Sequence, residues 1–206
     1  MASLPVAQSP PQHDAAHGRP NAAQVIARTQ AWLEHAVIGL NLCPFAKAVH
    51  VKQQIHYAVS RADTANALLA DLEIEISALR ALDSAARETT LLIAPGCCEE
   101  FLEFNDLLRK ADRWLAKAKL QDEFQIASFH PRYVFAGAAE DDVSHCTNRA
   151  PFPILHLLRE ASVTGAIAAV PEASLIYEHN IDTLKHLGHE GWQQLAVRWS
   201  GSPSGS

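Results

Sequence analysis

Thr89-Thr90-Leu91-Leu92-Ile93-Ala94 is the stretch that decides the fold, and Pro95-Gly96 follows it directly. Its run of apolar residues is short and continuous, which is typical of a strand covered on both faces. Helical patterns flank it, one starting at Asp63 and reaching Leu79, the other running from about Glu99 to Lys119. A strand with a helix before and after it predicts an α/β fold.

Two further strands extend this pattern, over Val51–Ser60 and Phe124–Phe129. A first helix is predicted over Asn21–Gly39, with Asn21 as its N-cap, because apolar residues recur there at spacings of three and four. The order helix, strand, helix, strand, helix, strand indicates right-handed crossovers onto one sheet of three or four strands. Helices pack around this sheet, and an α+β arrangement stays open as the alternative.

The last third of the chain is predicted to be helical. Arg132–Arg149 is interpreted as a long loop, and a loop of this length inside a compact domain is often functional. Helices are then expected over Pro153–Ala161 and Ser174–Leu187, followed by a short turn around Trp192.

Composition indicates one compact α/β domain, over residues 21–198. The chain has 206 residues, of which 48% are hydrophobic, and this is enough for one core but too little for two. Residues 1–20 are rich in proline, glutamine and alanine, so a disordered N-terminal tail is expected there. Residues 199–206 are expected to form a flexible C-terminal tail.

Charge and cysteine usage exclude several classes of protein. The formal net charge is −6 and the basic residues are scattered, which argues against a nucleic-acid partner. No apolar run is long enough to span a membrane and no secretory signal is apparent, so a cytoplasmic location with free thiols is expected. Cys97 and Cys98 are adjacent, so they are expected to point in different directions and to serve as packing residues.

Cys43 is the first candidate for chemistry. It precedes Pro44, and proline favours the first turn of a helix. A thiol at such a helix start meets unpaired N–H groups that favour negative charge, so a reactive thiolate is predicted. The alternative is a small buried residue in a turn between helices.

His130 is the second candidate, because it ends the strand over Phe124–Phe129. Ligands of open α/β sheets bind beyond the carboxyl ends of strands, where a histidine is suited to act as a base or a ligand. The alternative is a histidine that only satisfies a junction between strand and loop.

The third candidate is the helix predicted over Pro153–Ala161. His156, Arg159 and Glu160 are spaced three and four apart, so they are expected on one helix face. Arg159 offers a planar fork to an anion, Glu160 is placed to orient His156, and the helix start adds free N–H groups. Asn148 and Arg149 directly precede this segment and are expected to bind the same substrate. The alternative is a solvated face with a surface ion pair.

No metal site is predicted, because the spacing of the histidines and cysteines fits no metal-binding template. The sequence also indicates no particular cofactor and no oligomeric state.

The chain resembles a known family, which covers roughly residues 22 to 195. The resemblance is carried by Leu42-Cys43-Pro44-Phe45-Ala46, Phe129-His130-Pro131, Asn148-Arg149-Ala150-Pro151-Phe152-Pro153 and His156-Leu157-Leu158-Arg159-Glu160. The family is the bacterial and plastid one catalogued as domain of unknown function number 1415. The resemblance implies that these segments are hallmark positions, and it implies no activity.

The leading hypothesis is a small cytoplasmic enzyme acting on a small anionic molecule. Cys43 would be its nucleophile or redox thiol, with His130 and His156 as acid–base groups. Asn148, Arg149, Arg159 and Glu160 would bind the substrate. One alternative is a non-catalytic module that binds a small anion or a metal cofactor, and another is an interaction protein in which these motifs only hold loops. All site predictions require Cys43, His130 and His156 to share one pocket.

Overall fold

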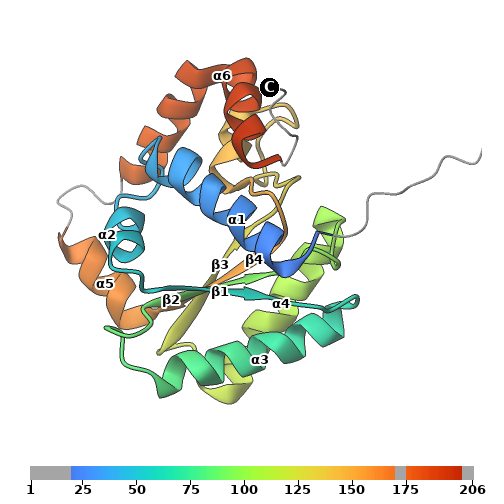
Figure 1. Cartoon of the computed structure of the whole chain (residues 1–206), viewed down its shortest axis with the longest axis vertical. Helices are drawn as coiled ribbons and strands as arrows, with labels where there is room; N and C mark the ends of the chain where they lie inside the picture. Colours follow the sequence, from blue (N-terminus) through green and yellow to red (C-terminus); the bar gives the residue numbers. More distant parts are fainter. Residues whose placement is uncertain (1–19, 170–174, 201–206) are drawn as a thin grey trace, which may run out of the picture.

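A computed structural model describes residues 20–169 and 175–200. They form a four-stranded sheet with helices packed around it (Figure 1). The strands are β1 (Ile55–Val59), β2 (Thr89–Ile93), β3 (Phe124–Phe129) and β4 (Ile154–Arg159), in the order β1-β2-β4-β3. β1 and β2 are parallel, whereas β4 is antiparallel to both of its neighbours. The three strands predicted from the sequence therefore run in one direction, and the predicted α/β fold is confirmed.

The prediction of a helix over Pro153–Ala161 is wrong, because most of this segment forms β4. Ile154, Leu155 and Leu157 are buried, and neighbouring residues of the strand face opposite sides of the sheet. Both sides are covered, so the run shows no alternation of apolar and polar residues. Such a run cannot be distinguished from a buried helix by periodicity. The helix α5 (Glu160–Ala169) starts only where the strand ends.

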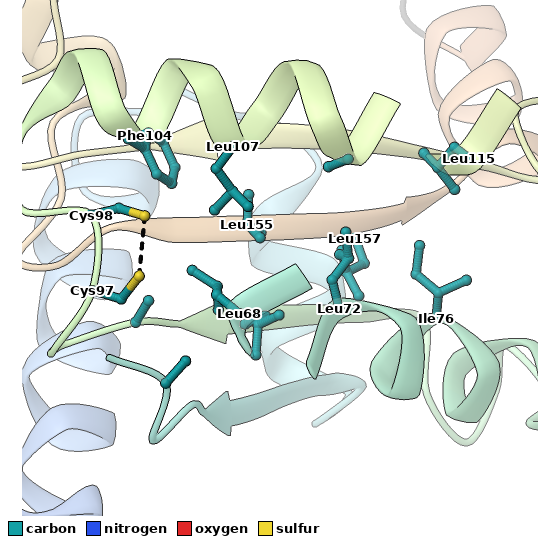
Figure 2. Packing of buried hydrophobic residues seen from close by; sticks show 14 of the residues in the cluster. Leu68, Leu72, Ile76, Cys97, Cys98, Phe104, Leu107, Leu115, Leu155 and Leu157 are labelled. Atoms are coloured by element: carbon teal, nitrogen blue, oxygen red, sulfur yellow. Dashed lines mark hydrogen bonds between the residues drawn. The ribbon is translucent and has the colours of Figure 1, made fainter. Parts of the chain in front are cut away.

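One face of the sheet is covered by α3 (Ala65–Ala81), which lies at the bottom of Figure 1, and by α4 (Phe101–Ala118). Apolar side chains of the two helices meet those of the sheet in a core cluster that contains almost no exposed surface. Figure 2 shows, among others, Leu68, Leu72, Ile76, Phe104, Leu107, Leu155 and Leu157 in this cluster.

The opposite face is covered by α1 (Ala22–Trp32) and by η1 (Leu33–Ile38), a π-helical continuation of α1. The short helix α2 (Ala46–Val51) and α5 also lie on this side (Figure 1). The Trp32 ring packs edge-on against Phe129 of β3, with 5.1 Å between the ring centroids. The sheet is thus the middle layer of three.

The predicted N-cap of the first helix is confirmed at Asn21. Its side chain accepts a hydrogen bond from the Gln24 backbone N–H at 3.0 Å, and the Gln24 side chain accepts one from the Asn21 N–H at 3.0 Å. This reciprocal arrangement satisfies two donors that a helix start leaves free.

Several other element boundaries differ from the predicted ones. The strand expected from Val51 begins at Ile55, because Ala46–Val51 forms α2 and the chain leaves that helix through a left-handed Gln53. The cap of α3 is Thr64 rather than Asp63. The loop predicted over Arg132–Arg149 contains a 3-10 helix, η2 (Val143–Asn148).

At the C-terminal end, the predicted turn around Trp192 is wrong. The helix α6 (Ile176–Ser200) continues through that residue, and its kink lies at Gly188, where φ is 67°. Trp199 is buried, and its carbonyl accepts a hydrogen bond from Arg28 Nε of α1 at 2.8 Å. Residues 199 and 200 therefore belong to the helix and not to a tail. Residues 1–19, 201–206 and the predicted helix start at Ser174 lie outside the described residues.

The adjacent cysteines also differ from the prediction, because their side chains point toward each other (Figure 2). The Sγ atoms of Cys97 and Cys98 are 3.1 Å apart, and both residues are buried at the end of the core below the sheet. Of the helices that the structure describes, none is long and apolar enough to cross a membrane.

Candidate functional site

A cavity of about 340 Å³ lies between the sheet and the helices α1, η1, α2 and α5. All four strands contribute to its floor, and the surface inside is almost entirely apolar. Trp32 and Phe129 supply aromatic walls, while Val163 and Ala166 of α5 close one side. Among the described residues that line it, Glu88 is the only one with an ionisable acidic or basic side chain other than Cys43 and His156. The cavity is therefore suited to apolar atoms rather than to an ion.

His156 projects into this cavity from β4. Its partners across the sheet are Leu91 of β2 and Ala127 of β3, so its neighbours on the same face carry no polar side chain. The imidazole is partly accessible from the cavity and is surrounded by protein elsewhere, and this burial lowers its pKa to about 4. At neutral pH the ring is uncharged, with one nitrogen that donates and one that accepts a hydrogen bond. It makes no hydrogen bond to any residue the structure describes, which leaves both nitrogens available to a ligand.

Cys43 lines the same cavity from the turn between η1 and α2. Backbone N–H groups of Phe45 and Ala46 donate to the thiol and act to lower its pKa, as the predicted helix start requires. Burial acts in the opposite direction and is the larger effect, so the pKa of Cys43 is raised above its ordinary value. Cys43 is therefore a thiol at neutral pH and not the predicted thiolate. No hydrogen bond joins it to His156 within the described part of the chain.

His130 lies on the opposite face of the sheet and does not reach the cavity. It is fully buried, with its ring between Phe101 and Phe104 of α4, at centroid distances of 5.3 Å and 5.2 Å. Its Nε2 is 3.0 Å from the Cys98 carbonyl oxygen. Of the three side chains that the sequence placed in one pocket, the structure brings Cys43 and His156 together and separates His130 from them.

Asn148 and Arg149 do not line the cavity. They stabilise the loop over residues 132–149 by hydrogen bonds. The Asn148 side-chain amide N–H donates to the Ser128 carbonyl at 3.0 Å, and the Asn148 backbone carbonyl accepts from the His130 backbone N–H at 3.0 Å. Arg149 donates through Nε to the Tyr133 carbonyl at 3.3 Å. The Arg149 carbonyl accepts a hydrogen bond from Trp32 Nε1 at 2.9 Å, which positions one wall of the cavity.

Arg159 is not on one face with His156, because both lie in β4 and residues three apart in a strand point to opposite sides. Glu160 lies beyond the strand, at the start of α5, and does not line the cavity. Arg159 Nη2 reaches the carbonyl oxygens of Leu79, Leu82 and Arg87 at 2.7, 2.7 and 3.1 Å. Glu160 starts α5 and accepts a hydrogen bond from Thr164 Oγ1 at 3.4 Å. None of the four residues expected to bind an anion therefore lines the cavity.

Among the cavity residues that the sequence did not indicate are Glu88 and the inner side of α5, with Ser162, Val163 and Ala166. Almost every position of α5 is apolar or small, so no stripe marks the side that faces the cavity. No group of three or more His, Cys, Asp and Glu side chains among residues 20–169 and 175–200 is arranged to hold a metal ion.

Comparison with known protein families gives a match over most of the chain. The family described as "Protein of unknown function (DUF1415)" matches residues 24–194. No curated protein and no solved structure gave a significant match.

Proposed function

The chain belongs to this family of unknown function, and we propose from its cavity that the protein binds a small, uncharged and largely apolar molecule between α5 and the sheet. The observation that carries the proposal is the apolar cavity with the uncharged imidazole of His156 on its floor. Its volume of about 340 Å³ is at the lower end of the range for ligand pockets, which limits the ligand to a small molecule.

The charge of the lining favours an uncharged ligand over the anion predicted from the sequence. Glu88 would repel an anion, and Arg149 and Arg159 are bonded elsewhere and do not line the cavity. Burying an unpaired charge among apolar side chains is costly, whereas a hydroxyl or carbonyl of the ligand has His156 as a hydrogen-bond partner. Binding is thus expected to combine apolar contact with one directional hydrogen bond.

A cytoplasmic setting is part of this proposal. All four cysteines, including Cys43 at the cavity, are free thiols, and such thiols persist in a reducing compartment.

A substitution on α5 tests the proposal. Ala166→Phe places a ring in the cavity, so binding of small uncharged aromatic and aliphatic compounds should weaken at least about tenfold. The measurement is ligand-observed NMR or the ligand-dependent shift in Tm, with matched carboxylates screened beside the uncharged compounds. Ala168→Phe is the control, because Ala168 lies exposed on the same helix and outside the cavity. Binding of carboxylates alone, or equal affinities in both variants, would refute the proposal.

Catalysis at the same cavity is the second candidate function, and it is favoured by the thiol and the imidazole lining one space. An uncharged His156 is in the protonation state that accepts a proton from Cys43 during nucleophilic attack. His156→Gln should then slow alkylation of Cys43 by N-ethylmaleimide at pH 7 at least about tenfold. The readout is the mass of the peptide that contains Cys43, and equal rates in the two proteins would leave binding as the only role.

A further inference from the structure

Cys97 and Cys98 form a close pair of thiols on the face of the sheet opposite the cavity. The pair follows Pro95-Gly96 at the end of β2, and both residues are only 3% exposed. Their Sγ atoms are 3.1 Å apart (Figure 2). Adjacent side chains seldom meet in this way, and here Cys98 has a left-handed backbone, with φ at 57°. Few residues other than glycine adopt this conformation unless the surrounding structure holds them in it.

His130 is one of the groups that hold Cys98. Its Nδ1 accepts a hydrogen bond from the Arg132 N–H at 3.0 Å, so the ring proton lies on Nε2. Nε2 therefore donates to the Cys98 carbonyl oxygen, at 3.0 Å. Arg132 adds a hydrogen bond to the Glu99 carbonyl and an ion pair with Glu100 at 2.8 Å. The loop that carries the two thiols is thus held by side chains from the end of β3.

We propose that Cys97 and Cys98 are a two-electron redox site whose substrate is a small hydroperoxide such as hydrogen peroxide. One sulfur attacks the O–O bond, which gives a sulfenic acid and one molecule of water. The second sulfur then attacks the sulfenic sulfur, the disulfide bond forms, and the hydroxyl leaves as a second molecule of water. The two thiols together lose two electrons and two protons, and the peroxide is reduced to two molecules of water.

The geometry favours a disulfide within the pair over other products. The sulfurs need to approach only from 3.1 Å to about 2.05 Å, so the second thiol is in place when the first is oxidised. Burial excludes large partners, including a second copy of the protein, so the oxidant has to be small. Adjacent Cα atoms are about 3.8 Å apart, closer than in most disulfides, and this makes the product easy to reduce.

Peptide mapping of the oxidised protein tests the proposal without any substitution. The folded protein is treated with hydrogen peroxide, denatured in iodoacetamide and cleaved with trypsin. Peptide 88–109 contains both thiols and no other cysteine. After peroxide treatment this peptide should be lighter than its reduced, unalkylated form by two hydrogen atoms and should carry no alkyl group. After mild reduction and renewed treatment with iodoacetamide it should carry two alkyl groups. A peptide that stays fully alkylated after peroxide treatment, or that carries sulfinic acid without a disulfide, would overturn the proposal.

Two single variants provide the matched control. Cys97→Ser and Cys98→Ser each keep one thiol, so a sulfenic acid formed there has no partner and should react with dimedone. The wild-type protein should show at most about a tenth of this labelling, because the second thiol resolves the intermediate. Equal labelling in all three proteins would contradict a paired site. The outcome is independent of the ligand proposal, because Cys43 and His156 take no part in it.

Discussion

The folded protein is expected to lose about 2 kcal/mol of its free energy of unfolding between pH 7 and pH 5 through His156 alone. Burial lowers the pKa of this histidine to about 4, whereas in the unfolded chain it titrates near its ordinary value of 6.5. Below pH 6.5 the unfolded state therefore binds a proton that the folded state excludes. The stabilising contribution is complete above pH 6.5 and is lost progressively as the pH falls toward 4.

His156→Gln isolates this effect, because glutamine does not titrate. Urea unfolding of both proteins at pH 7, 6 and 5 should give a stability difference that falls by about 2 kcal/mol over this range. His130 and His56, whose pKa values are also lowered by burial, are present in both proteins and cancel from the difference. Two stability curves that run parallel would show that the His156 ring is not buried as an uncharged group.

The lowered pKa of His156 connects stability with the proposed function. An imidazole that stays uncharged to about pH 4 can face an apolar ligand without the cost of a buried charge. Binding of an uncharged molecule should accordingly be constant through the neutral range.

The fold was predictable where local sequence determines the structure. β2 is marked by its continuous apolar run and the proline and glycine after it, and α1 by its apolar stripe and its cap at Asn21. β4 was not predictable, because it lies between two strands and is covered on both faces. The apolar run therefore lacks the alternation that marks a strand, and its neighbours are fixed only by long-range pairing.

The candidate site was predictable in part, and for reasons that depend on burial. The sequence placed Cys43 beside free N–H groups, which the structure has, but it did not reveal the burial that outweighs them. It placed His156 beside Arg159 by helical spacing, whereas the strand turns them to opposite faces. The approach of Cys97 to Cys98 depends on the left-handed backbone of Cys98, which His130 holds by a hydrogen bond. His130 is far from Cys98 in sequence, so no local pattern predicts this contact.

Arg159→Met is expected to lower the free energy of unfolding by about 3 kcal/mol, because hydrogen bonds from a charged group are stronger than those between neutral groups. The guanidinium bonds the carbonyl oxygens of Leu79, Leu82 and Arg87, at the point where α3 ends. A positive charge at a helix C-terminus is itself favourable, and methionine supplies neither the charge nor a donor. The three carbonyls would then be left without this partner.

Arg80→Met is the matched control, since Arg80 lies in the last turn of α3 and pairs with Glu123 at the exposed surface. This variant should change the free energy of unfolding by less than about 1 kcal/mol, which urea unfolding of both variants resolves. Affinity of the cavity for an uncharged ligand should be unchanged in Arg159→Met, because the guanidinium lies on the other face of the sheet. If Arg159→Met instead kept its stability and lost ligand binding, Arg159 would be a ligand-binding residue and not a support of α3.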